Sequence, residues 1–101
     1  MAGSGNEFVF FLEQHPEAFK AANSERHVRT LSLISRQAGN SELASKETGF
    51  TAKESEKILS ELEEAGLASR IRAGAKTLYY ASKLGLELLK KYESAKRSFG
   101  R

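Results

Sequence analysis

A helix start is encoded in the middle of this chain. Glu54 follows Thr51 by three residues, which is the spacing of a capping box: the threonine oxygen accepts one free backbone amide and the glutamate accepts another. Gly49 allows a sharp exit from the preceding element, and Gly66 stops the new one. These signals predict a helix over residues 51–65. A chain of 101 residues can build one modest core around it.

The two sides of this helix differ in chemistry. At about 100° per residue, one side should face the core and the opposite side should face outward. The predicted buried side consists of Ser55, Ile58, Leu59 and Leu62. The opposite side consists of Lys53, Lys57, Ser60 and Glu64, with Glu56 and Glu61 at its margins.

Two shorter helices are expected before it. Ser24 can cap a helix that runs to about Ala38, and Gly39-Asn40 can end it. The apolar spacing of this helix predicts an inner face of Val28, Leu31, Ile34 and either Ser35 or Ala38. Ser41 can then cap the short helix ELASKET, with Leu43 and Ala44 facing inward.

The hydrophobic period changes after Gly66. The stretches LASRIR (67–72) and KTLYYA (76–81) flank Ala73-Gly74-Ala75, a turn that can place glycine at positive φ, so a β-hairpin is expected. Ser82 then caps a last helix. Its expected apolar side is Leu84, Leu88, Leu89, Tyr92, Ala95 and Phe99. The predicted fold class is therefore mainly α with a small β-hairpin.

The N-terminal segment is unusually apolar. Residues 7–14 (EFVFFLEQ) are apolar on nearly every side, and Pro16 can begin a second short helix, PEAFKAA. A segment that is apolar on nearly every side favours a subunit interface. The alternative is that it packs on its own domain. The interface expected between two copies combines this segment with the last helix: Phe8, Val9, Phe11, Leu12, Leu88, Tyr92, Ala95 and Phe99.

The order and spacing of these signals carry a family resemblance. The stretch SELASKETGFTAKESEKILSELEEAGLASRIRAGAKTLYYASKLGLELLKKY resembles the winged helix-turn-helix core of small prokaryotic regulators of the MarR-like and ArsR-like groups and their archaeal relatives. The matching marks are ELA, Gly49 in the turn, the pair Leu59 and Leu62, AGL after them, and YYASKLGLELLKKY. One departure is Ser82, which stands where the family favours threonine. The likeness covers residues 24–92 and does not extend to residues 1–23.

The resemblance implies an organisation and a function. Residues 1–23 would be an N-terminal helical extension and possible dimer interface, 24–92 the winged helix-turn-helix domain, and 93–101 the end of the last helix with a basic tail. Helix 51–65 would enter the major groove and the wing, residues 67–81, would lie on the DNA backbone. We therefore expect a homodimeric transcriptional regulator that binds double-stranded DNA sequence-specifically.

Five carboxylates on the expected recognition helix need an explanation, because DNA is a polyanion. Glu54 is used by the cap, and Glu61, Glu63 and Glu64 lie in the last turns, away from the helix end that enters the groove. Glu56 can accept a hydrogen bond from cytosine N4, or it can be part of a solvated face with i, i+4 pairs. The expected contacts from this helix are Thr51, Lys53, Glu56, Lys57 and Ser60.

Positive charge is concentrated in the C-terminal third. Residues 1–69 hold seven Lys and Arg against eleven Glu, a balance of −4, whereas residues 70–101 hold nine against two, a balance of +7. Arg70 and Arg72 alternate on the first wing strand and so share one face. The expected phosphate contacts are Arg70, Arg72, Lys76 and Thr77 of the wing and Ser41, Ser45 and Lys46 of the short helix, with Arg26 and Arg29 as further candidates. Ordinary solvation is the alternative for each.

Other function classes find less support. The chain has no Cys and no Asp, and its histidines, His15 and His27, are isolated, so we expect no enzyme, metal site or cofactor. The run FVFFL is too short to span a bilayer and no Lys or Arg precedes it, so we expect no signal peptide, no membrane partner and a cytoplasmic location. The competing function is a winged-helix module for protein–protein interaction in a transcription or replication assembly, which the acidic helix and the apolar N-terminal segment would also suit.

Overall fold

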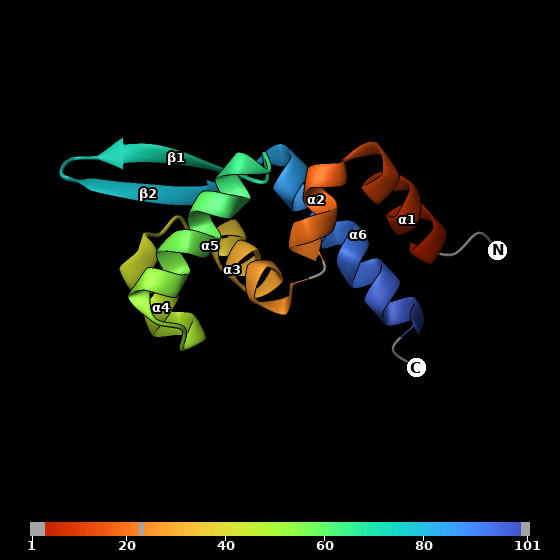
Figure 1. Ribbon diagram of the computed structural model, residues 1–101, viewed down its shortest axis with the longest axis horizontal. Coiled ribbons are helices and arrows are strands. Elements are labelled where there is room, and N and C mark those ends of the chain that lie inside the picture. Colours follow the sequence, from red (N-terminus) through yellow and green to blue (C-terminus); the bar gives the residue numbers. More distant parts are fainter. Residues whose placement is uncertain (1–3, 23, 100–101) are drawn as a thin grey trace.

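The computed structural model describes residues 4–22 and 24–99, which form six helices and one hairpin (Figure 1). The molecule is elongated, 49 × 25 × 19 Å, with the hairpin at one end and α1 beside the last turns of α6 at the other. The predicted fold class, mainly α with a small hairpin, is confirmed. In chain order the elements are α1 (Ser4–Gln14), α2 (Pro16–Ala22), α3 (Glu25–Arg36), α4 (Ser41–Thr48), α5 (Ala52–Glu64), β1 (Ala68–Ala73), β2 (Lys76–Ala81) and α6 (Lys83–Phe99).

The capping box at the start of α5 is formed as predicted. The Thr51 hydroxyl oxygen accepts the Glu54 amide at 3.0 Å, and the Glu54 carboxylate accepts the Thr51 amide at 3.2 Å. Gly49 ends α4 with φ of 84°, a left-handed conformation that favours glycine. Together these two caps fix the angle between α4 and α5, so the helix pair is set by local sequence.

Two boundaries differ from the sequence prediction. Asn40, and not Ser41, is the N-cap of α4: its side-chain oxygen accepts the Leu43 amide at 3.0 Å, and Ser41 becomes the first helical residue. Helix α3 ends at Arg36, with Gln37 as an extended C-cap, so Ala38 lies beyond it. Both shifts are small, because serine and asparagine are almost equally good caps and the helix end is marked only by the following glycine.

Helix α3 lies at the centre of the fold, where it contacts α2, α4, α5, α6 and β2. Leu31 and Ile34 are buried as predicted, but so are Thr30 and Leu33, whereas Val28 is only half-buried. A helix with neighbours on several sides buries more than one stripe, and this explains the additional residues. On α5 the predicted buried side is confirmed in full: Ser55, Ile58, Leu59 and Leu62.

The hairpin is antiparallel, with Ala68 paired to Ala81 at its base and Ala73 paired to Lys76 at its tip. The loop is therefore Gly74-Ala75, with Gly74 at φ of 66°, and Ala73 belongs to the strand. Strand β2 is tied to the helical body, because Gly39 and Tyr79 exchange backbone hydrogen bonds of 3.0 and 2.7 Å. The base of the hairpin is thus fixed and its tip extends away from the helices (Figure 1).

The first turn of α6 is attached to the end of α5. Ser82 is the N-cap, since its hydroxyl oxygen accepts the Gly85 amide at 3.0 Å, and the same hydroxyl donates to the Gly66 carbonyl at 2.7 Å. Gly85 lies so close to the backbone of Leu67 that a Cβ atom there would be 2.1 Å from the Leu67 oxygen. A side chain at position 85 would push the two segments apart.

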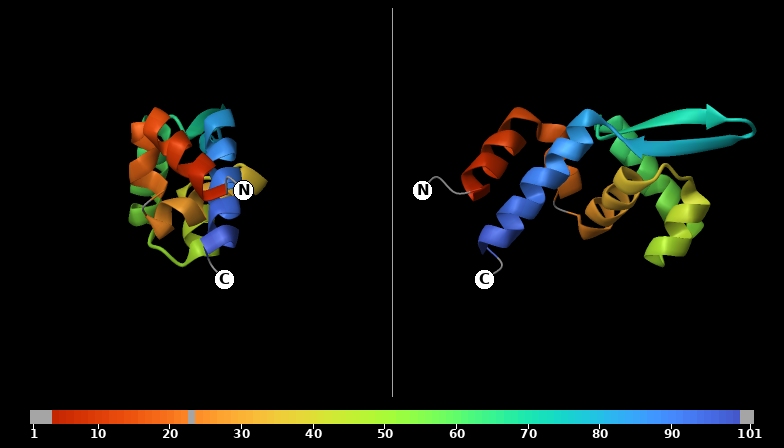
Figure 2. Two further views of the ribbon diagram at one scale, coloured as in Figure 1. Left: turned by 90° about the vertical axis from the view of Figure 1, so that its right-hand side faces the viewer. Right: turned by 180° about the vertical axis from the view of Figure 1, so that it is seen from behind.

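Helices α1 and α2 share the core of the remaining chain. Phe11, Ala18 and Ala21 are buried in one cluster with Leu31 and Leu88, and α1 runs alongside α6 (Figure 2). The N-terminal segment therefore packs on its own domain along part of its surface. This corrects the interface expectation for three residues, Phe11, Leu88 and Ala95, which are buried within the protomer.

The remaining residues of that expected interface have different surroundings. Val9 is 54% exposed and its neighbour Phe10, in the same apolar segment, is 60% exposed. Leu12 and Tyr92 are half-buried. The side chains of Phe8 and Phe99 lie outside the described part of the structure. Among the described side chains at this end of the molecule, the exposed apolar surface is centred on Val9 and Phe10.

Candidate nucleic-acid interface

One side of α5 is left uncovered by the rest of the fold. Lys53, Glu56, Lys57 and Ser60 are exposed on it, as the helical spacing predicted, and Thr51 is exposed at its start. The Thr51 hydroxyl is already engaged by Glu54, so its role in the structure is the cap. The uncovered side therefore offers two ammonium groups, one carboxylate and one hydroxyl.

The cationic face of the hairpin is turned to the same side as α5. Alternation along β1 places Arg70 and Arg72 on one face, opposite Tyr79 and Thr77 of β2. The Arg70 guanidinium contacts the Glu63 carboxylate in the last turn of α5 at 3.0 Å, which shows that this face is directed to α5. Arg72 is exposed beyond it and Thr77 is half-buried.

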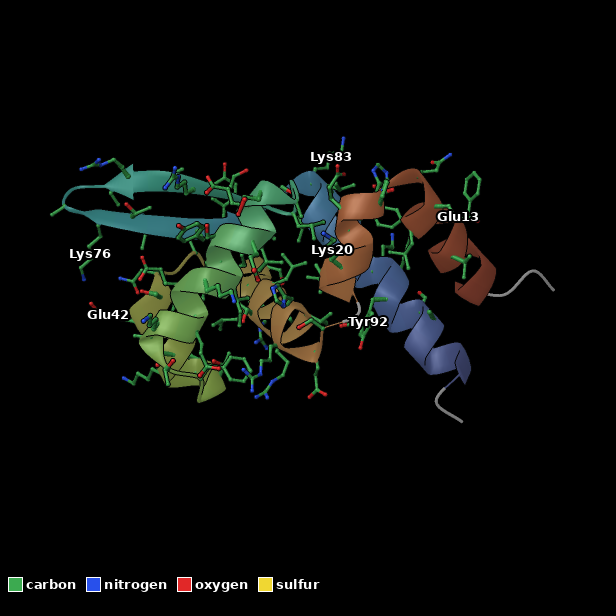
Figure 3. The ribbon with its side chains drawn as sticks, in the orientation of Figure 1. Glu13, Lys20, Glu42, Lys76, Lys83 and Tyr92 are labelled. Atoms are coloured by element: carbon green, nitrogen blue, oxygen red, sulfur yellow. The ribbon has the colours of Figure 1, made fainter. Side chains whose placement is uncertain are left out.

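Lys76 is exposed at the tip of the hairpin, with its side chain directed away from the strand (Figure 3). Lys76 lies nearer the tip of the hairpin than Arg72, because the register pairs Lys76 with Ala73 next to the turn. The expected wing cations are thus brought together on one projecting element.

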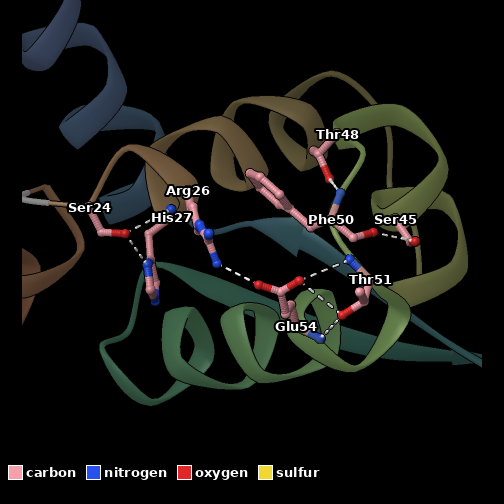
Figure 4. Close-up of polar contacts among 8 residues, drawn as sticks. All are labelled: Ser24, Arg26, His27, Ser45, Thr48, Phe50, Thr51 and Glu54. Carbon is pink, nitrogen blue, oxygen red and sulfur yellow. Dashed lines mark hydrogen bonds and ion pairs between the residues drawn. The ribbon is translucent and has the colours of Figure 1, made fainter.

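Helix α4 contributes less than the sequence suggested. The Ser45 hydroxyl donates to the Phe50 carbonyl and so stabilises the turn between α4 and α5 (Figure 4). Ser41 is half-buried in the first turn of α4, and Lys46 is exposed. Of the three residues expected to contact DNA from this helix, only Lys46 presents an exposed charged group.

A second cationic cluster lies at the opposite end of α5. The guanidinium groups of Arg26 and Arg29 lie over the ring of Phe50, at 5.4 and 5.3 Å from its centre, just before Thr51. Figure 4 shows Arg26 and Phe50. Sequence spacing of three places both arginines on one side of α3, but it gives no sign that they converge on Phe50. Positive groups are therefore found at both ends of α5.

Known proteins resemble this chain in structure and not in sequence. No protein family model matches the chain, and no curated protein matches it by sequence. Among solved structures, it is similar to the homodimeric winged helix-turn-helix DNA-binding domain of a possible ArsR-family transcriptional regulator from Mycobacterium bovis, with a TM-score of 0.70, 21% identity, and 97% of this chain and 89% of that one covered. It is also similar to HlyU from Vibrio cholerae, with a TM-score of 0.67, 18% identity, and coverage of 84% and 90%.

A third similar structure is a mutant of MepR from S. aureus bound to an oligodeoxyribonucleotide, with a TM-score of 0.69, 15% identity, and coverage of 93% and 78%. This chain has the winged helix-turn-helix fold. Helices α4 and α5 form the helix-turn-helix pair and the β1–β2 hairpin is the wing. The resemblance found in the sequence is thereby confirmed at the level of the fold.

The carboxylates of the helix that follows the turn have partners within the winged helix. Glu54 forms an ion pair with Arg26, Glu61 accepts from or pairs with the His27 ring at 2.7 Å, and Glu63 pairs with Arg70 of the wing. The opposite ring nitrogen of His27 lies 2.7 Å from the Ser24 hydroxyl, so this histidine is a half-buried connector and not a free surface residue. Glu56 and Glu64 are exposed, with no ion pair among the described residues.

The environment of Glu54 favours its charged form. Hydrogen bonds from the Thr51 amide and hydroxyl, with smaller help from the Arg26 guanidinium, lower the pKa of Glu54 below its ordinary value. The carboxylate also lies at the positive end of the helix dipole. Glu54 is therefore an ionised structural group at neutral pH, and its charge is matched locally by Arg26.

The part of the chain that the structure describes contains neither a metal-binding cluster nor a membrane-spanning helix. No three His or Glu side chains converge there to hold a metal ion. Within the same residues, no helix combines the length and the apolar character needed to cross a bilayer.

Proposed function

We propose that this winged helix binds double-stranded DNA sequence-specifically as a small transcriptional regulator. Helix α5 would enter the major groove with its uncovered side, and the wing would lie along the backbone. The observation that supports this most directly is that cations stand at both ends of that uncovered side: Arg72 and Lys76 on the wing, and Arg29 beside Phe50. A groove presents phosphates on both of its walls, so this arrangement matches its charge.

The uncovered side of α5 would supply the base contacts. Lys53 and Lys57 can donate to guanine O6 and N7, Ser60 can contact either kind of base pair, and Glu56 can accept from cytosine N4. Because Glu54, Glu61 and Glu63 already have internal partners, they present less repulsion to DNA than five free carboxylates would. Sequence preference would then arise from four side chains.

A homodimer is the second part of the proposal. Val9 and Phe10 expose apolar surface at the end of the molecule opposite the wing, where α1 runs beside α6 (Figure 1). Association there would leave both wings free and point the two α5 helices to half-sites about one helical turn apart. The similar Mycobacterium bovis domain is described as homodimeric, which supports the same arrangement here.

Duplex titration at several salt concentrations tests DNA binding. The logarithm of the association constant should fall with the logarithm of salt by about 0.9 for each phosphate neutralised, and Arg72→Ala should lower this slope by about that amount on any duplex. Lys90→Ala removes an exposed cation from α6 and is the matched control. Lys57→Ala should change the preference among duplexes selected from a random pool more than it changes the slope. A weak response that does not depend on salt would favour the protein–protein interaction module.

Light scattering tests the dimer without removing the N-terminal helices, whose residues Phe11, Ala18 and Ala21 belong to the core. Phe10→Ser should reduce the particle mass to that of one chain at low concentration, because it removes exposed apolar area. Ile71→Thr, at the wing, should leave the mass unchanged. Equal masses for Phe10→Ser and the unmodified chain would exclude this surface as the dimer interface.

A further inference from the structure

The two faces of the wing differ in chemistry. One face carries Arg70 and Arg72 and is turned to α5. The other face, which we call the outer wing face, consists of Ser69, Ile71, Ala73, Lys76, Leu78 and Tyr80, since Ser69 pairs with Tyr80, Ile71 with Leu78 and Ala73 with Lys76. On this face Ile71 is 47% exposed and Tyr80 is 39% exposed, and Leu78 is half-buried. Adjacent exposed apolar side chains on a rigid hairpin are a mark of an interaction surface.

Nothing in the described fold uses the outer wing face. The hairpin is held at its base by the buried Ala68 and Ala81 and by the backbone bridge from Tyr79 to Gly39. The exposed end of α1 lies at the opposite end of the long axis (Figure 1), so a dimer formed there would leave the outer wing face open. A second copy of the chain is therefore a poor candidate to cover it.

The charge around this face indicates the chemistry of its occupant. Between residues 65 and 86 the chain contains four cations, Arg70, Arg72, Lys76 and Lys83, and no carboxylate. Of these four, only Arg70 has an ion-pair partner among the residues that the structure describes. Lys83 is exposed at the start of α6, directly after β2 (Figure 3). The positive charges that border the apolar face are thus Lys76 and Lys83, and neither has an ion-pair partner among the described residues.

We propose that the outer wing face docks an acidic segment of a partner protein whose apolar side chains pack on Ile71, Leu78 and Tyr80. The carboxylates of that segment would lie against Lys76, which shares this face at the tip of the hairpin, and against Lys83 beyond its base. Apolar burial supplies affinity, and the charged border selects acidic over basic segments. This inference goes beyond DNA binding. Arg70 and Arg72 lie on the opposite face of the hairpin, turned to α5, and so stay available to a duplex while the segment is bound.

The test uses a phage-displayed library of random peptides, with the full chain as bait in the presence and absence of duplex DNA. We expect enrichment of peptides that combine Asp or Glu with Leu, Ile, Phe or Trp. Their affinity should fall by about tenfold in Ile71→Thr, which keeps a β-branched side chain and removes apolar contact. Lys83→Gln should weaken them mainly at low salt, because a screened charge is lost.

Lys90→Gln is the matched control for Lys83→Gln, since it removes another exposed cation from α6, about two turns further along the helix. It should leave peptide affinity unchanged. Tyr80→Thr is a second variant on the same face, and thermal unfolding of each variant verifies that the hairpin is intact. Both face variants should retain the salt slope for duplex DNA.

Several results would overturn the proposal. One is a library that yields no acidic apolar peptides, and another is a set of peptides whose affinity Ile71→Thr and Tyr80→Thr leave unchanged. If the two substitutions weaken duplex binding instead, the face lies on DNA. If they change the particle mass in light scattering, it lies on a second copy. Failure of the peptide selection with an intact salt slope would leave the proposed DNA-binding function standing.

Discussion

The contact between the wing and α5 makes a quantitative prediction for Glu63→Gln. Arg70 is one of the cations expected to meet phosphate, yet its guanidinium lies 3.0 Å from the Glu63 carboxylate. To bind DNA, Arg70 has to exchange or share this partner. Substitution by glutamine keeps the size of the side chain and removes the charge, so duplex affinity should increase.

The magnitude follows from the exposure of the pair. The Arg70 and Glu63 side chains are 59% and 31% exposed, and exposed ion pairs contribute about 0.2–1 kcal/mol. Repulsion between the Glu63 carboxylate and a phosphate about 10 Å away adds about 0.4 kcal/mol in water, before screening by salt. The sum is about 0.6–1.4 kcal/mol, so Glu63→Gln should raise duplex affinity about three- to tenfold at low salt.

The assay is a fluorescence titration of a short duplex at several salt concentrations, with Glu64→Gln as the matched control. Glu64 is the next residue on α5, exposed and with no ion pair among the described residues, so its substitution removes the same charge but frees no cation. We expect less than a twofold increase for Glu64→Gln, because only the repulsion is relieved. In an Arg70→Ala background the excess effect of Glu63→Gln should disappear, since its partner is absent.

Equal gains for the two glutamine variants would refute this reasoning, because they would mean that only net charge matters. So would an excess effect of Glu63→Gln that persists in the Arg70→Ala background. A decrease in duplex affinity would indicate that the ion pair holds the wing in its binding orientation, and the structural role of Glu63 would then outweigh its charge.

Three further predictions concern stability. Ser55 is buried with its hydroxyl unpaired among the described residues, so Ser55→Ala should raise the free energy of unfolding by about 1 kcal/mol in urea denaturation. A lower free energy of unfolding in this variant would mean that the hydroxyl has a partner. Gly85→Ala should lower the free energy of unfolding by about 1–3 kcal/mol, because the close contact of the new Cβ with the Leu67 backbone outweighs the better helix propensity of alanine. An unchanged free energy of unfolding would mean that α6 can move away from Leu67 without cost. The lowered pKa of Glu54 stabilises the fold above its ordinary value of 4.5, and this contribution is lost as pH falls through the lower folded pKa. Melting temperatures of the unmodified chain should therefore fall more between pH about 5 and 3 than those of Glu54→Gln, and parallel pH curves would contradict this.

Much of the fold could be predicted because its signals are local. The capping box of Thr51 and Glu54, the left-handed Gly49 and the cap at Ser82 each involve residues within a few positions of one another. The two sides of α5 followed from helical spacing alone. Misplaced boundaries, such as the cap at Asn40, arose where two adjacent residues could serve the same purpose.

The interface could be predicted only in part, because its electrostatics depend on contacts that are distant in sequence. Exposed Lys53 and Lys57 were identified from periodicity, but the partner of His27 lies 34 residues away at Glu61, and Arg26 meets Glu54 from another helix. Burial of Phe11 within the protomer had the same cause, since the sequence does not reveal that α6 passes beside α1. Charge counts along the chain cannot separate a paired carboxylate from a free one.

The paired carboxylates suggest why an acidic helix suits this fold. Glu54 and Glu61 connect α5 to Arg26 and His27 of α3, and Glu63 connects it to the wing, so the three contacts restrain α5 on two neighbouring elements. The ion pairs of Arg26 and Arg70 also offset two exposed positive charges, which lowers attraction to any polyanion. A protein that binds through few remaining cations gains little affinity from phosphates alone and depends more on its base contacts. In this chain, specificity would then be obtained by limiting the electrostatic contribution, and duplexes that mismatch α5 should be released at salt concentrations that a correct site tolerates.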